Sequence, residues 1–145
     1  MKMSFKNILV PFDNSSFSKR AFNLALDIAQ KYDSTIIVVS CIDLLTTKWI
    51  DKTTYENALL KKARKQLLKE IIPLQTKAQK KGIPFKPKII ESSSIGRALL
   101  SFAKTKNIDL IIIGSHGKGF FDRLILGSIT NRIIQQSHCP VLVVK

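Results

Sequence analysis

The sequence has 145 residues, 45% of them hydrophobic, which suits one globular domain with a buried core and leaves no room for a second. The first ten residues carry Lys2 and Lys6 and an apolar run that stops at Pro11, so neither a signal peptide nor a membrane span fits. We therefore expect a cytoplasmic protein with no membrane segment. A total of 24 Lys and Arg against 10 Asp and Glu gives a net charge of +14, which favours acidic or polyanionic partners.

The two cysteines, Cys41 and Cys139, lie in apolar segments and form no CxxC pair. This spacing gives little support to a metal or redox site. We expect both side chains to be small buried hydrophobes, and we assign no metal ligands.

Strand and helix patterns alternate from the amino terminus. Residues 7–11 predict a strand that ends at a proline, and the side-chain oxygens of residues 13–16 predict the start of a helix. Apolar residues recur every three or four positions over 17–31, as an amphipathic helix requires. Residues 36–42 are mostly apolar, which is typical of a central strand covered by helices on both faces.

A long helix is predicted after the polar connection 46–54, with a kink at Pro73 and an end at Gly82. Ten basic residues and one acid, Glu70, lie between positions 61 and 88. The basic residues are Lys61, Lys62, Arg64, Lys65, Lys69, Lys77, Lys80, Lys81, Lys86 and Lys88. We interpret them as a solvated helix face, with a polyanion-binding surface as the alternative, because no nucleic-acid-binding motif accompanies them.

The second half continues the alternation. Residues 85–91 predict a strand that Pro87 confines to a sheet edge, and Ser92 to Ser94 supply a cap for a helix that Asn107 ends. The remaining predicted elements are a strand over 108–113, a helix over 128–136 and a strand over 141–144.

This alternation predicts an α/β fold, a single doubly wound, Rossmann-like domain with a five-stranded parallel sheet and helices on both faces. We expect the strand order 3-2-1-4-5, which makes the first and fourth strands neighbours and places a ligand site at their carboxyl ends. Periodicity alone leaves open a flavodoxin-like order, in which the first and third strands flank the site.

A glycine motif follows the fourth predicted strand. Gly114, Gly117 and the pair Gly127-Ser128 have the spacing G-x2-G-x9-G-S. Glycine permits a positive φ and leaves backbone N–H groups uncovered, so an anionic group can approach them. The motif therefore predicts a phosphate-sized loop before a helix.

The chain resembles the universal stress protein family and, within that family, its ATP-binding branch. The resemblance spans essentially the whole chain and rests on three segments, which are residues 10–15 (VPFDNS), residues 113–118 (IGSHGK) with Gly127-Ser128, and residues 140–144 (PVLVV). It implies an adenine nucleotide, ATP with or without Mg²⁺, across the ends of the first, second and fourth strands.

By this resemblance, Asp13 binds the ribose or adenine end, the Cys41 backbone meets the adenine edge, and the glycines with Ser128 surround the triphosphate. The implied cofactor-binding residues are Pro11, Asp13, Cys41, Ile113, Gly114, Ser115, His116, Gly117, Gly127, Ser128, Ile129 and Thr130. Helix capping is the alternative role for Asp13.

The sequence also predicts roles for other residues in and near the motif. We predict no catalytic role for His116, because no carboxylate pair or nucleophile accompanies it. We predict that Lys118 and Arg123 are solvent-exposed, with a place near the phosphates as the alternative, and Lys118 is no Walker lysine because the pattern GxxxxGK[ST] is absent. We interpret Phe120 and Phe121 as packing residues, with a partner-contact patch as the alternative, and Trp49 and Tyr55 as a lid over the adenine.

The sequence thus favours an ATP-binding regulatory protein with no catalytic residues. A weak ATPase and a polyanion-binding protein remain the alternatives, and nucleic acid is a disfavoured partner. The uncharged run from Val141 through Leu142 and Val143 to Val144 predicts an edge strand that pairs with a second copy of the chain, and the family resemblance implies the same homodimer.

Overall fold

The computed structural model of the chain describes residues 4–47, 54–118 and 125–145. The sheet has five parallel strands in the order β3-β2-β1-β4-β5. The strands are β1 (Asn7–Pro11), β2 (Thr35–Asp43), β3 (Phe85–Ser92), β4 (Leu110–Gly114) and β5 (Val141–Val144). The predicted order is confirmed, and the flavodoxin-like order is excluded.

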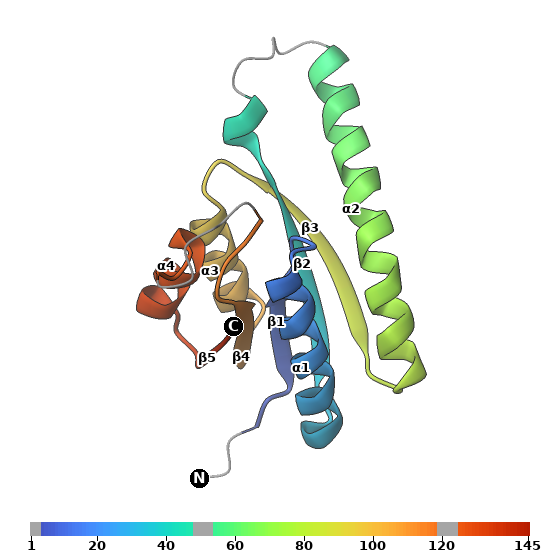
Figure 1. Ribbon diagram of the computed structural model, residues 1–145, viewed down its shortest axis with the longest axis vertical. Coiled ribbons are helices and arrows are strands. Elements are labelled where there is room, and N and C mark those ends of the chain that lie inside the picture. The colour runs from blue at the N-terminus through green and yellow to red at the C-terminus, as the bar shows by residue number, and fades with distance from the viewer. Residues whose placement is uncertain (1–3, 48–53, 119–124) are drawn as a thin grey trace.

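Helices cover both faces of the sheet (Figure 1). The helices are α1 (Ser16–Tyr32), α2 (Thr54–Lys80), α3 (Ile95–Thr105) and α4 (Ser128–Gln136), with a 3₁₀ turn at Leu44–Thr47. Side chains of α1 and α2 pack with Ile8, Val10 and Ile36 on one face, whereas α3 and α4 pack with Leu9, Val39 and Ile111 on the other. Both faces of β1, β2 and β4 are therefore buried, as their continuous apolar sequences predict.

The winding of the chain reverses beside β1. The chain passes from β1 through β2 to β3 on one side, and then returns to place β4 and β5 on the other side of β1. The loops after β1 and β4 consequently leave the sheet toward opposite faces, and a crevice opens between them.

Helix α2 continues through Pro73 to Lys80, so the proline does not end the helix, as predicted. Pro73 is exposed, and water can therefore hydrogen-bond to the Lys69 carbonyl that has lost its N–H partner. Because β3 pairs only with β2, Pro87 does lie in an edge strand, as predicted.

Two further details differ from the expectations. Ser94 is the N-cap of α3, but its side chain makes no capping hydrogen bond, and the Ser92 hydroxyl instead accepts from the Ser94 N–H at 3.0 Å. The fourth strand begins at Leu110 rather than Ile108, because the Asp109 carboxylate turns back to accept from the Asn7 N–H at 2.8 Å. Neither difference reaches the crevice.

Candidate functional site

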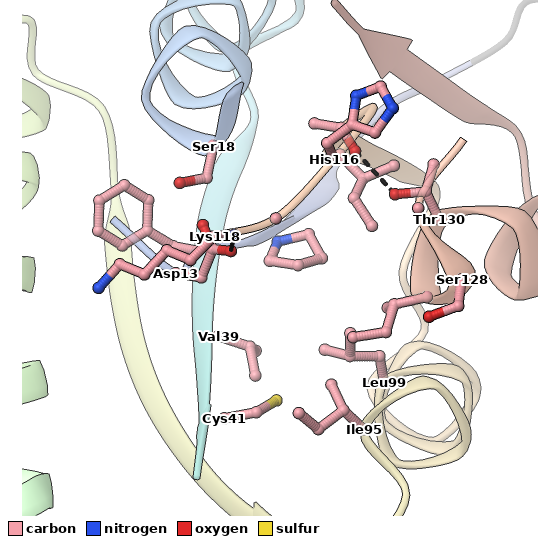
Figure 2. Close-up of a pocket in the computed structure, with 17 residues that line it drawn as sticks. Asp13, Ser18, Val39, Cys41, Ile95, Leu99, His116, Lys118, Ser128 and Thr130 are labelled. Atoms are coloured by element: carbon pink, nitrogen blue, oxygen red, sulfur yellow. Dashed lines mark hydrogen bonds between the residues drawn. The ribbon is translucent and has the colours of Figure 1, made fainter. Parts of the chain in front are cut away.

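A cavity of about 290 Å³ opens at the carboxyl ends of β1, β2 and β4. Its lining consists of Pro11, Phe12, Asp13, Ser18, Val39, Cys41, Ile95, Leu99, Ile113, Gly114, His116, Gly117, Lys118, Gly127, Ser128, Ile129 and Thr130. Every residue that the sequence predicted for the site lines this cavity except Ser115. Figure 2 shows these side chains converging from strands and helices that are distant in sequence.

Asp13 joins the end of β1 to the glycine loop after β4. Its Oδ1 accepts from the Ser15 N–H at 3.0 Å, and its Oδ2 accepts from the Lys118 N–H at 3.0 Å. The next residue, Asn14, has a φ of 66°, which turns the chain toward α1. Asp13 therefore closes the turn before α1 and also holds the loop that contains Gly117.

The same contacts fix the charge of Asp13. Burial is the largest single influence and raises the pKa of this carboxyl, but hydrogen bonds from Ser15, Lys118 and Ser18 together hold the pKa below its usual 3.8. Because the folded-state pKa is lowered, the ionised carboxylate stabilises the fold above the usual pKa, and this contribution is lost as the pH falls below it.

We predict that Asp13→Asn lowers the free energy of unfolding at neutral pH by about 1 kcal/mol or less, since the site is partly solvated. An amide offers only one acceptor oxygen, so either the Ser15 or the Lys118 N–H loses its partner. Urea denaturation of both proteins across acidic pH should show the difference shrinking below pH 3.8. A difference that stays constant down to the acid limit would contradict the assigned charge.

The amino terminus of α4 is fastened to the end of β4. The Gly127 N–H donates to the Ser115 carbonyl at 2.9 Å, and the Thr130 hydroxyl donates to the Gly114 carbonyl at 2.8 Å. In turn, the Ser115 N–H donates to the Val144 carbonyl of β5 at 2.8 Å. Ser115 is thus buried, does not line the cavity and connects β5 to the start of α4 through its backbone. Its role as a ligand residue stays a prediction.

These hydrogen bonds orient the first turn of α4 toward the cavity. The N–H groups of Ser128, Ile129 and Thr130 precede the first intrahelical bond, which runs from the Asn131 N–H to the Gly127 carbonyl at 2.9 Å. Such first-turn donors, at the positive end of a helix dipole, are suited to an anion. The first turn contains no acidic residue that would compete for them.

The glycines are required for close packing rather than for an unusual backbone. Among the glycines of the described residues, only Gly82 has a positive φ, so Gly114 and Gly117 do not use the positive φ that glycine permits. A Cβ on Gly114 would lie 2.7 Å from Cβ of Phe17, and one on Gly117 would lie 2.8 Å from Oδ2 of Asp13. Gly114 lets α1 pack against β4, and Gly117 lets the loop reach Asp13.

His116 is buried beside the loop, and both of its ring nitrogens are engaged. Nε2 contacts the Ile125 carbonyl, which can only accept, so Nε2 carries the proton and Nδ1 accepts from the Ser115 hydroxyl at 2.9 Å. The ring also packs against Phe17, with centroids 5.1 Å apart. This arrangement positions the loop and offers no ring nitrogen for acid or base chemistry.

The other end of the cavity is apolar. Val39, Cys41, Ile95 and Leu99 lie together in Figure 2, on the side of the cavity away from Ser18 and His116. Burial raises the pKa of the Cys41 thiol to about 11, so the thiol is neutral at physiological pH. Both cysteines are partly exposed, rather than buried as predicted.

Several lining residues were not predicted from the sequence, namely Phe12, Ser18, Val39, Ile95 and Leu99. Val39 was accessible to prediction, because it lies two positions before Cys41 and therefore on the same face of β2. Ile95 and Leu99 share a helix face, but no local pattern shows that this face borders the cavity. Lys118 also lines the cavity and is exposed, as predicted.

The sequence model of the universal stress protein family matches residues 4–145. The chain belongs to the universal stress protein family. A relative from Methanocaldococcus jannaschii, universal stress protein MJ0531, is 31% identical over 144 residues, covering 97% of this chain and 82% of the relative. The solved structure of the hypothetical protein MJ0577 superposes with a TM-score of 0.87 at 27% identity, over 97% of this chain and 96% of the other.

Two more distant members of the universal stress protein family were solved with nucleotides. A universal stress protein in complex with cAMP has a TM-score of 0.72 at 18% identity, over 97% of each chain. The Archaeoglobus fulgidus protein in complex with dAMP has a TM-score of 0.66 at 17% identity, over 99% of this chain and the whole of the other. At these identities the likeness establishes the shared fold alone.

Some residues for which the sequence predicted a role lie outside the described residues of this universal stress protein. These are Trp49, Phe120, Phe121, Arg123 and the side chain of Tyr55. Within the described ranges, no group of three or more His, Cys, Asp or Glu side chains is arranged to hold a metal ion. No helix in the same ranges has the length and hydropathy to cross a bilayer.

Proposed function

We propose that this protein is a cytoplasmic, ATP-binding universal stress protein that acts as a nucleotide-responsive regulatory module. The observation that carries the proposal is the joint placement of the α4 first turn and the Gly114–Lys118 loop at one end of a single cavity. A polyphosphate at this end meets backbone donors and a helix dipole, and the site needs few charged side chains for that purpose.

The apolar end of the cavity suits a flat purine. Val39 and Leu99 supply hydrophobic walls, and Cys41 offers backbone polar groups at the end of β2 for a base edge. Asp13 also lines the cavity and presents a carboxylate that can accept from a ribose hydroxyl. The family members solved with cAMP and dAMP share the adenine base, which supports an adenine nucleotide here.

Rapid turnover has little support among the lining residues. Among the residues that the structure describes, Asp13 is the only carboxylate that lines the cavity, and both of its oxygens already accept backbone N–H bonds. His116 uses Nε2 and Nδ1 to hold the loop. We therefore assign binding rather than hydrolysis, and any Mg²⁺ would be carried by the nucleotide phosphates rather than by a protein cluster.

Isothermal titration calorimetry with ATP and GTP, at low and high salt, tests the proposed function. We expect saturable ATP binding, weaker GTP binding and a modest loss of affinity at high salt, because backbone amides rather than lysines contact the phosphates. Mass spectrometry of ligand released from freshly purified protein should identify the same adenine nucleotide. A protein that binds no nucleotide, or that binds both equally with a steep salt dependence, would disprove the assignment.

We also propose a homodimer through β5. The carbonyls of Pro140 and Val144 accept from β4, so the alternate residues Val141 and Val143 direct their N–H and C=O groups away from β4. Leu142 of β5 and Ile134 of α4 are 36% and 42% exposed. A second copy pairing along β5 would cover both features.

Leu142→Lys should shift the protein from dimer to monomer, because it places a charge within the proposed interface. Sedimentation velocity at several protein concentrations measures the change. Leu45→Lys is the matched control, since Leu45 is 46% exposed in the 3₁₀ turn after β2 and should leave assembly unaltered. Equal sedimentation of all three proteins would reject the β5 interface.

A further inference from the structure

The outward face of α2 carries a feature that the nucleotide site does not use. Leu68 and Ile72 are 48% and 58% exposed, although they are one turn apart on a helix whose buried side is formed by Ile71, Leu74 and Ala78. At 100° per residue, Leu68 lies about 60° and Ile72 about 100° from Ile71 around the helix, so the exposed pair lies beside the buried side. The apolar surface of the helix therefore extends beyond its buried side, and no described element covers the exposed part.

Lysines surround this exposed pair. Lys65 and Lys61 lie on the same side of the helix, about one and two turns before Leu68, and Lys62 and Lys69 lie along its flank. All four lysine side chains are exposed. On the opposite flank, Arg64 is paired with Glu91 of β3 at 2.5 Å, so it is already neutralised.

The position of α2 makes this face accessible. Figure 1 shows α2 along the outer flank of the molecule, with α1, β3 and the rest of the sheet all on one side of it. A flat surface could therefore contact several turns of α2 without touching α3, α4 or the cavity. We define Lys61, Lys62, Lys65, Leu68, Lys69 and Ile72 as the α2 outer face.

We propose that the α2 outer face docks on an anionic lipid surface. Leu68 and Ile72 would enter the boundary between headgroups and acyl chains, and the lysines would extend toward the lipid phosphates and carboxylates. This pairing of aliphatic side chains with flanking lysines is characteristic of helices that lie in a membrane interface. It differs from a membrane span, because only one face of the helix is apolar toward the lipid.

Other occupants fit the face less well. A second copy of this chain would oppose lysine to lysine, in a protein whose net charge is +14. A nucleic acid would draw on the charges but has no use for Leu68 and Ile72, and the face has no aromatic side chain on which a base could stack. Charge complementarity and the aliphatic pair together therefore favour lipid.

Vesicle co-sedimentation with the full chain tests the proposal. Wild-type protein should bind phosphatidylcholine vesicles that contain phosphatidylserine and should not bind vesicles of phosphatidylcholine alone. Leu68→Gln with Ile72→Gln keeps the charge and the helix propensity, and it should weaken binding at least about fivefold. Lys61→Glu with Lys65→Glu should weaken it at least about tenfold.

A charge-matched variant separates the α2 outer face from bulk charge. Lys104→Glu with Lys106→Glu makes the same change in net charge at exposed positions by α3, on the opposite side of the sheet, and should retain most of the binding. Thermal melts of each variant establish that the fold is intact. Equal losses in both lysine variants, or full binding by the double Gln variant, would overturn the proposal.

Binding to duplex DNA is compared with binding to anionic vesicles as a further test. Wild-type protein that binds duplex DNA in fluorescence anisotropy but binds no anionic vesicle in the same buffer would show a nucleic-acid surface instead, and the lipid proposal would be wrong. Because none of the substituted residues lines the cavity, nucleotide calorimetry on the same variants reports separately on the proposed function.

Discussion

Gly114→Ala is expected to lower the free energy of unfolding by about 2 to 3 kcal/mol, which is a large fraction of the stability of a small domain. The added Cβ would lie 2.7 Å from Cβ of Phe17 and 2.9 Å from its backbone carbon. Neither atom is the end of a flexible side chain, so α1 must move away from β4. Urea denaturation, followed by circular dichroism, measures the loss.

Gly127→Ala is the matched control for this variant. A Cβ at position 127 would come no closer than 3.4 Å to any atom outside its chain neighbours, the nearest being the Ser115 carbonyl oxygen. Its cost should therefore stay below about 1 kcal/mol. If the two alanine variants unfold at the same urea concentration, the packing role of Gly114 is refuted.

Gly117→Val is expected to reduce ATP affinity at least about 100-fold, equivalent to about 2.7 kcal/mol, while the fold is retained. The new Cβ would lie 2.8 Å from Oδ2 of Asp13, so the carboxylate must move and the Lys118 N–H loses its acceptor. The valine therefore displaces both the loop that contains Gly117 and the Asp13 carboxylate, which line one side of the cavity. Because Gly117 is exposed, we expect little change in unfolding free energy.

A double-mutant cycle distinguishes this mechanism from simple obstruction of the cavity. If Gly117→Val acts by displacing Asp13, it should cost much less affinity in an Asp13→Ala background than in the wild type. Calorimetry on the four proteins supplies the coupling energy. Additive losses would mean that the valine blocks the phosphates directly, and unchanged affinity in the single variant would remove the loop from the site.

The structure gives Gly114 and Gly117 a packing role that the sequence motif did not predict. The motif G-x2-G-x9-G-S suggested exposed amides and positive φ, and neither Gly114 nor Gly117 has a positive φ. A sequence motif records that a side chain is excluded, but not which neighbour excludes it. For Gly114 that neighbour is Phe17 of α1, and for Gly117 it is Asp13, more than 100 positions away.

Ser115, in contrast to the other predicted site residues, does not line the cavity. Its place in the loop suggested a ligand contact, but its carbonyl, N–H and hydroxyl bind Gly127, Val144 and His116 respectively. Adjacent residues of a loop face different directions, and only the packing of α4 and β5 determines which of them faces the cavity. Ile95 and Leu99 were missed because α3 reaches the cavity through packing that has no local signature.

The sequence by itself determined the order and type of the elements, since apolar periodicity and proline and glycine positions act over a few residues at a time. It also placed the glycine motif after β4 and the acid after β1. The tertiary structure alone decided that Asp13 holds the Lys118 amide, that α3 completes the apolar end of the cavity, and that Leu68 and Ile72 lie uncovered on α2. These features depend on contacts between distant segments, which form only when the sheet brings its strand ends together.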